Sequence, residues 1–144
     1  MIVDFHCHTF PEKIAAHALR HMQAMSHNAV FTDGTSAALI KSMADANVTY
    51  SVVLPVVTNP DKTAHINDLS IARNNINGLI YFGGSHPDSA NVRSELVRLR
   101  KAGIQGIKLH PLQQATNIDD PRYLHILECC GELGLIVGFL AYFV

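Results

Sequence analysis

Five apolar runs, separated by segments with helical periodicity, are the feature that most constrains the fold of this chain. The runs span residues 2–8, 49–56, 79–84, 104–109 and 134–140. They contain little polar alternation, which is typical of strands buried on both faces of a parallel sheet. Helical patterns occupy residues 12–26, 35–47, 61–77, 89–102 and 120–133. The last of these begins with Asp120 as a capping residue and Pro121 at the first helical position. The sequence therefore predicts an α/β fold with about five parallel strands and outer helices.

Composition indicates one ordinary globular domain over residues 1–144. The chain is 48% hydrophobic and 16% charged, and its net charge of -1 gives no basic surface for nucleic acid. No apolar stretch approaches the ~20 residues of a membrane span, and no secretory pattern opens the chain. Cys7, Cys129 and Cys130 lack metal-type spacing, so we expect free thiols in a reducing compartment, the cytoplasm.

Polar side chains follow four successive predicted strands at the point where each strand ends. These side chains are His6, His8, Thr58, Asn59, Asp61, Ser85, His86, Asp88, Lys108 and His110. In a doubly wound sheet and in a (β/α)₈ barrel alike, the chemistry lies at the carboxyl ends of the strands. Because four strand ends deliver such groups together, we expect strands in sequence order, curling as in a barrel.

A histidine doublet closes the first strand. Side chains alternate along a strand, so His6 and His8 share one face, with Asp4 beside them. Imidazole is the commonest metal-binding side chain, so the pair predicts two ligands of one metal ion. Asp4 would orient an imidazole or serve as a buried structural carboxylate. The alternative is a pair of surface histidines or the remnant of a tag.

Three segments, in this order, resemble the amidohydrolase-related family of metal-dependent (β/α)₈ barrels. They are Val3-Asp4-Phe5-His6-Cys7-His8-Thr9-Phe10-Pro11, Tyr81-Phe82-Gly83-Gly84-Ser85-His86-Pro87-Asp88 and Gly106-Ile107-Lys108-Leu109-His110-Pro111. The branch that they resemble includes proteins similar to aminocarboxymuconate-semialdehyde decarboxylase. The resemblance runs along essentially the whole chain.

This resemblance implies a divalent metal, most often Zn²⁺, held at the barrel mouth by His6 and His8. Family members add a histidine at the end of strand five and an aspartate at the end of strand eight. The implied activity is hydrolysis of C–N or C–O bonds, or non-oxidative decarboxylation, of a small carboxylated substrate. A phosphoesterase barrel, which also begins with a histidine doublet, fits less well because its further acidic and histidine motifs are lacking.

The chain departs from the family pattern after its fifth strand. Leu140 stands about where the third ligand belongs, and 144 residues are little more than half of the ~250 in a full barrel. We therefore expect the N-terminal half of a barrel, with little or no turnover as this chain. The alternative function is a non-catalytic fragment that self-associates through its open half-barrel, so a homo-oligomer is expected.

Lys108 and His110 are the candidate catalytic residues on the substrate side. Both stand at the end of the fourth strand and share one face of it. Lys108 would bind a substrate carboxylate, be carboxylated and bridge metals as in binuclear relatives, or pair with Asp4 or another carboxylate. His110 would either line the site or stabilise the loop that begins at Pro111. The same two roles are open to His86.

Overall fold

The computed structural model describes residues 1–26 and 29–140. Its internal contacts divide the chain into two compact units. The first unit comprises Met1–Val53 and Asn75–Ile80, and the second comprises Leu54–Asn74 and Tyr81–Val144. The histidine doublet belongs to the first unit and the other strand-end clusters to the second.

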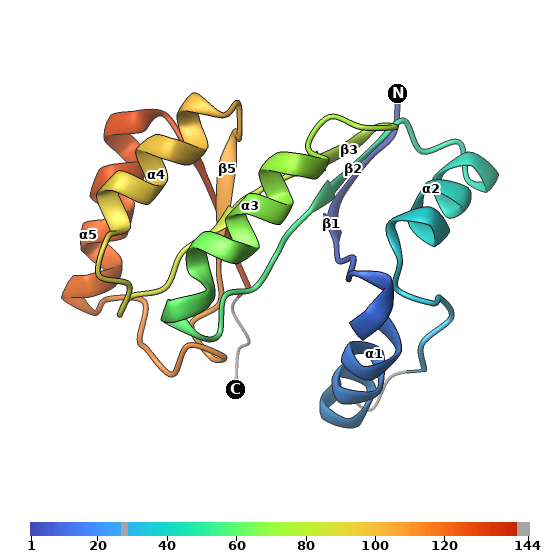
Figure 1. The fold of residues 1–144 in the computed structure, drawn as a ribbon, viewed down its shortest axis with the longest axis horizontal. Coiled ribbons are helices and arrows are strands. Elements are labelled where there is room, and N and C mark those ends of the chain that lie inside the picture. The colour runs from blue at the N-terminus through green and yellow to red at the C-terminus, as the bar shows by residue number, and fades with distance from the viewer. Residues whose placement is uncertain (27–28, 141–144) are drawn as a thin grey trace. The chain divides into compact units, whose positions relative to one another are not determined.

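The first unit is built on a three-stranded sheet with the order β1 (Val3–Cys7), β2 (Tyr50–Val53) and β3 (Leu79–Tyr81) (Figure 1). Strands β1 and β2 are parallel, with Val3 opposite Tyr50. Two helices, α1 (Glu12–Ser26) and α2 (Ser36–Asp45), lie between β1 and β2 in the chain. The Thr35 side chain accepts a hydrogen bond from Ala38 N and caps α2.

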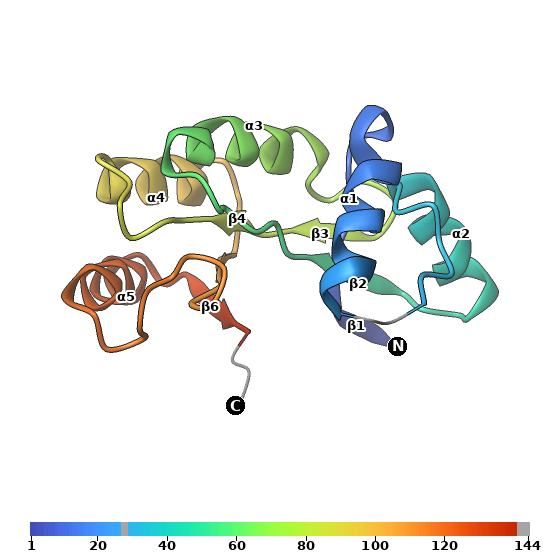
Figure 2. The ribbon, with the colours of Figure 1, turned by 90° about the horizontal axis from the view of Figure 1, so that it is seen from below.

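The second unit contains a parallel sheet with the order β4 (Gly83–Gly84), β5 (Gly106–Leu109) and β6 (Ile136–Phe139) (Figure 2). Its helical elements are a short 3₁₀ turn η1 (Pro60–Lys62), α3 (Thr63–Arg73), α4 (Val92–Lys101) and α5 (Pro121–Leu133). The Asp120 side chain caps α5, and Gly134 ends it in the left-handed conformation, at φ 63°.

The core of the second unit lies where α4 and α5 pack against β5. Its buried members are Val92, Leu96, Leu99, Ile104, Ile107, Leu109, Tyr123, Ile126, Cys129, Cys130 and Leu135. Ile107 and Leu109 both face this core, so the residues that alternate with them in β5 face the other side of the sheet. Lys108 and His110 are therefore turned away from the helices.

The predicted strand 79–84 is one strand in the sequence pattern but two in the structure. Strands β3 and β4 belong to different sheets, with Phe82 between them. The cause is a pair of asparagine side chains. Asn74 Oδ1 accepts a hydrogen bond from Tyr81 N at 2.9 Å, while Asn67 accepts from Gly84 N and donates to Gly84 O at 2.8 and 3.0 Å. These backbone groups are thus bonded to side chains, and six strands replace the five that we predicted.

The other predicted strands and all five predicted helices are present, and both sheets keep the sequential, parallel order that we expected. The prediction that β1 is buried on both faces was wrong, because Val3 and Phe5 are 44% and 51% exposed. The three cysteines are free, as predicted, and all three are buried. Among the described residues, no helix has the length and apolar character needed to cross a membrane.

Candidate active site

The two histidines of the doublet lie together at the end of β1. Their ring centroids are 5.0 Å apart, and the rings meet edge to face. The Asp4 carboxylate accepts a hydrogen bond from His6 N at 3.2 Å, which orders the backbone between them. Cys7 alternates with the histidines and is buried, and burial is the largest cause that raises the pKa of its thiol to about 11. The thiol is therefore protonated at neutral pH, which leaves the two imidazoles as the candidate metal ligands of this strand.

The donor chemistry of His6 and His8 fits part of a zinc site. Imidazole nitrogens bind zinc at ~2.0–2.1 Å, and two rings this close can reach one ion. A catalytic zinc usually has three protein ligands and one open position. Within residues 1–26 and 29–140, no group of three or more His, Cys, Asp or Glu side chains is arranged to hold a metal ion. Among the described residues, the two imidazoles of the doublet thus remain candidate ligands without a third beside them.

Lys108 occupies a buried position in the middle of the second sheet. Its side chain is 1% exposed, and its Nζ has no hydrogen-bond partner among the described residues. One alternative from the sequence was an ion pair between Lys108 and a carboxylate. No such pair is formed among the described residues. Its in-register neighbours are Gly84 on β4 and Gly138 on β6, so no side chain stands directly beside it on either strand. Burial lowers the pKa of the ammonium, since the charged form is desolvated.

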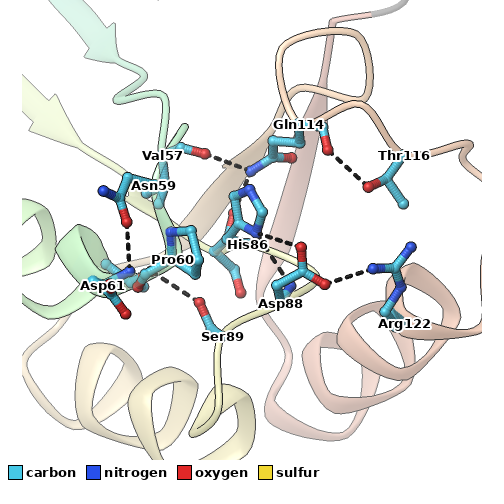
Figure 3. Close-up of polar contacts among 12 residues, drawn as sticks. Val57, Asn59, Pro60, Asp61, His86, Asp88, Ser89, Gln114, Thr116 and Arg122 are labelled. Atoms are coloured by element: carbon cyan, nitrogen blue, oxygen red, sulfur yellow. Dashed lines mark hydrogen bonds and ion pairs between the residues drawn. The ribbon is translucent and has the colours of Figure 1, made fainter.

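Gln114 joins three chain segments through hydrogen bonds from one side chain (Figure 3). Its Nε2 donates to Val57 O and to Ser85 O, both at 2.7 Å, and its Oε1 accepts from His110 N at 3.0 Å. The Tyr123 hydroxyl donates to the same Oε1. All four hydrogen-bonding positions of one buried carboxamide are thus used. The amide fixes the backbone that carries His86 and His110.

His86 is buried at the end of β4 and is linked to the surface through Asp88 (Figure 3). Its Nδ1 accepts a hydrogen bond from Asp88 N at 3.1 Å and lies 3.9 Å from the Asp88 carboxylate. The carboxylate of Asp88 pairs with Arg122 at 2.5 Å, and Arg122 pairs with Asp120 at 2.8 Å. Burial is the largest influence on the pKa of His86 and lowers it, although the Asp88 carboxylate acts in the opposite direction. Burial of His86 therefore favours its neutral form.

Some predicted strand-end residues serve the local fold. Asn59 Oδ1 accepts a hydrogen bond from Asp61 N at 2.9 Å and caps the 3₁₀ turn that begins at Pro60 (Figure 3). Sequence reasoning missed Gln114 and Tyr123. Gln114 sits in a polar loop beside the exposed Gln113, and no spacing distinguishes the two.

Comparisons with solved structures show the fold. The chain is similar to IDCase from Metarhizium anisopliae in its apo form, with 15% identity and a TM-score of 0.68, over 96% of this chain and 50% of that one. It is similar to 5-carboxyvanillate decarboxylase from Novosphingobium aromaticivorans, with 14% identity and a TM-score of 0.66, over 95% and 49% of the two chains. That structure holds manganese and 3-methoxy-4-hydroxy-5-nitrobenzoic acid.

A third similar structure is a probable 2-pyrone-4,6-dicarboxylic acid hydrolase from Acinetobacter baumannii with citric acid bound. The identity is 19% and the TM-score 0.55, over 96% of this chain and 48% of that one. The chain thus spans about half the length of the structures that it matches. The fold is that of one half of a (β/α)₈ barrel, as predicted.

Among curated proteins, none matches this sequence. The model of one protein family, described as amidohydrolase, matches residues 3–143, which is nearly the whole chain. That match includes the histidine doublet and the strand ends that carry His86, Lys108 and His110, so the resemblance drawn from the three sequence segments is confirmed. The chain belongs to the amidohydrolase family.

Proposed function

We propose that this chain carries the N-terminal part of a metal-dependent hydrolase or lyase acting on a small carboxylated substrate. The observation that carries the proposal is the buried ammonium of Lys108 at a strand end of an amidohydrolase-family chain. A buried cation without a partner costs free energy, and a substrate carboxylate would compensate for that cost. The similar decarboxylase and hydrolase structures support the same substrate class.

In this proposal His6 and His8 hold the divalent metal, with Zn²⁺ as the ion. When bound, zinc lowers the pKa of a water toward ~7 and polarises a carbonyl. Lys108 binds the substrate carboxylate, and His110 lines the site beside it. We place the protein in the cytoplasm, on the basis of its three free cysteines.

We expect the 144-residue chain to show little or no turnover, because its described residues supply only two clear metal ligands. The measurement is zinc-dependent decarboxylation of 5-carboxyvanillate and hydrolysis of 2-pyrone-4,6-dicarboxylate by the purified chain and by its His6→Ala variant. His65→Ala, which changes an exposed histidine of α3, is the matched control. Rates near the uncatalysed background in all three proteins are expected. A robust rate that only His6→Ala abolishes would show that two histidines suffice.

Self-association is a second candidate behaviour. Among the described strands β1 pairs only with β2 and β6 only with β5, so each sheet has an open outer strand. Phe5 on β1 and Ile136 on β6 are both 51% exposed. Because an exposed outer strand can pair with another chain, we propose that a second copy covers these strands.

Sedimentation equilibrium at tens of micromolar tests this, since ordinary interfaces have micromolar or tighter affinity. We expect a dimer that Phe5→Lys weakens. Phe31→Lys, which changes a 96% exposed phenylalanine outside the strands, should leave it intact. A wild-type monomer at that concentration, or equal effects of both substitutions, would contradict the proposed interface.

A further inference from the structure

Two histidines of α1 stand one helical turn apart on the surface of the first unit. His17 and His21 are both exposed, and the α-helix runs without interruption over Glu12–Ser26. Residues four apart on a helix are neighbours, with Cβ atoms about 5–6 Å from each other, and their side chains lie in one row along the helix. The spacing therefore brings the two imidazoles to one place on the helix surface.

The packing of α1 turns these two histidines away from the rest of the first unit. Ala15 is 3% exposed, and a Cβ added at Gly34 would stand 3.0 Å from Leu19 Cδ1, so Ala15 and Leu19 mark the packed face of the helix. Each residue advances about 100° around the helix axis. His17 follows Ala15 by two places and His21 follows Leu19 by two places, which puts both histidines about 200° from the packed face. They are thus on the opposite, solvent side of α1.

Neither imidazole is engaged by another protein group. Among the residues that the structure describes, His17 and His21 take part in no hydrogen bond or ion pair. The charged side chain in the same row is Lys13, which is exposed and stands one turn before His17. Arg20 precedes His21 in the sequence but lies about 100° away around the axis. The imidazole nitrogens are therefore available to a metal ion, and the Lys13 ammonium is the charge that opposes its binding.

We propose that His17 and His21 form a surface chelate for a divalent transition-metal ion, with Cu²⁺ bound most tightly. Neutral imidazole suits Cu²⁺, Ni²⁺ and Zn²⁺, and among these ions the affinity of a nitrogen site is highest for Cu²⁺. Once one ring has bound the ion, the second is held close to it, so the pair binds more tightly than either ring alone. Water completes the coordination. The site is separate from the one proposed at His6 and His8 on β1 and does not depend on it.

An ion held by both rings also stabilises the helix. The two imidazoles meet only while the chain between them is helical, so the ion binds folded α1 in preference to the unfolded segment. Backbone amides of α1 should therefore exchange with solvent more slowly when the metal is present. This readout does not depend on any catalytic activity of the chain.

The test is paramagnetic broadening of backbone amide resonances by Cu²⁺ in the ¹⁵N-labelled 144-residue protein. We expect broadening around His17 and His21. His17→Ala and His21→Ala should each weaken Cu²⁺ binding at α1 at least about tenfold, because each variant keeps a single imidazole. Lys13→His should strengthen binding, because it removes a positive charge and adds a third ring in the same row. His65→Ala, which changes an exposed histidine of α3 with no other histidine one turn away, is the matched control.

The same spectra separate this chelate from the metal site proposed on β1, because the broadening is local. Broadening of α1 alone supports the chelate and counts against His6 and His8 as metal ligands. Broadening of β1 alone overturns the chelate and leaves the site on β1 standing, and broadening of both supports both. Binding at α1 that neither alanine substitution weakens, or that Lys13→His leaves unchanged, would also overturn the chelate. The substituted positions on α1 are exposed, so we expect each variant to fold.

Discussion

Replacing Gln114 by leucine should lower the free energy of unfolding by about 3 kcal/mol or more. Leucine fills a similar volume but offers no hydrogen bonds. The substitution leaves Val57 O, Ser85 O, His110 N and the Tyr123 hydroxyl without their partner in a buried place. Each unsatisfied buried group costs about 1–3 kcal/mol, part of which local relaxation recovers.

Urea denaturation of both proteins measures this difference, and Gln113→Leu is the matched control. Gln113 is the adjacent glutamine in the same loop, and its side chain is exposed. An exposed substitution of this kind changes stability by no more than about 0.5 kcal/mol. Equal losses at the two positions would mean that the loop as a whole, and not the Gln114 carboxamide, stabilises the strand ends.

Gly106→Ala should destabilise the second sheet by a comparable amount, about 3 kcal/mol. Gly106 begins β5 and lies opposite Ile136 on β6. A Cβ on this residue would stand 2.5 Å from Phe82 Cε2 and 2.6 Å from Ile136 O. The ring of Phe82 is buried and the carbonyl is backbone, so the contact can be relieved only by moving one strand away from the other.

Gly131→Ala is the control for this prediction, and its expected effect has the opposite sign. Gly131 is exposed within α5, and a Cβ there has no atom within 4 Å. Because glycine is a poor helix former, alanine should stabilise the protein by up to about 1 kcal/mol. The same urea measurement compares the two variants. A neutral Gly106→Ala would show that β5 and β6 can separate without loss.

The elements that could be predicted from sequence are those whose cause is local. Asp120 and Pro121 mark the start of α5 because capping and the proline ring act within one turn. The alternation of His6 and His8 predicted neighbouring rings, and the rings are neighbours. Their role as metal ligands stays a prediction, as do the roles of Lys108 and His110.

The features that sequence reasoning missed depend on partners far along the chain. Asn67 bonds to Gly84, 17 residues away, and that contact separates β4 from β3. Gln114 reaches Val57, 57 residues away, and nothing in the loop around it indicates that partner. A polar residue in a loop is usually solvated, so the sequence pattern predicts an exposed side chain for Gln114, whereas the side chain is buried. The exposure of Phe5 was missed for a related reason. An apolar strand pattern predicts burial, but it does not show which other segment would cover the side chain.

Backbone groups donate hydrogen bonds to Nδ1 of two buried histidines, from Asp88 N to His86 and from Gln113 N to His110. This origin in the backbone limits how the protein can diverge. Every residue type except proline supplies an N–H, so most substitutions at Asp88 or Gln113 keep the donor to the ring. Point mutation is therefore a poor route to exchanging the protonated and unprotonated nitrogens of these rings. An insertion or deletion in the turn that follows each histidine would displace the donor and free Nδ1 to carry the proton. Descendants that recruit these histidines to a metal should thus differ in loop length more than in residue identity.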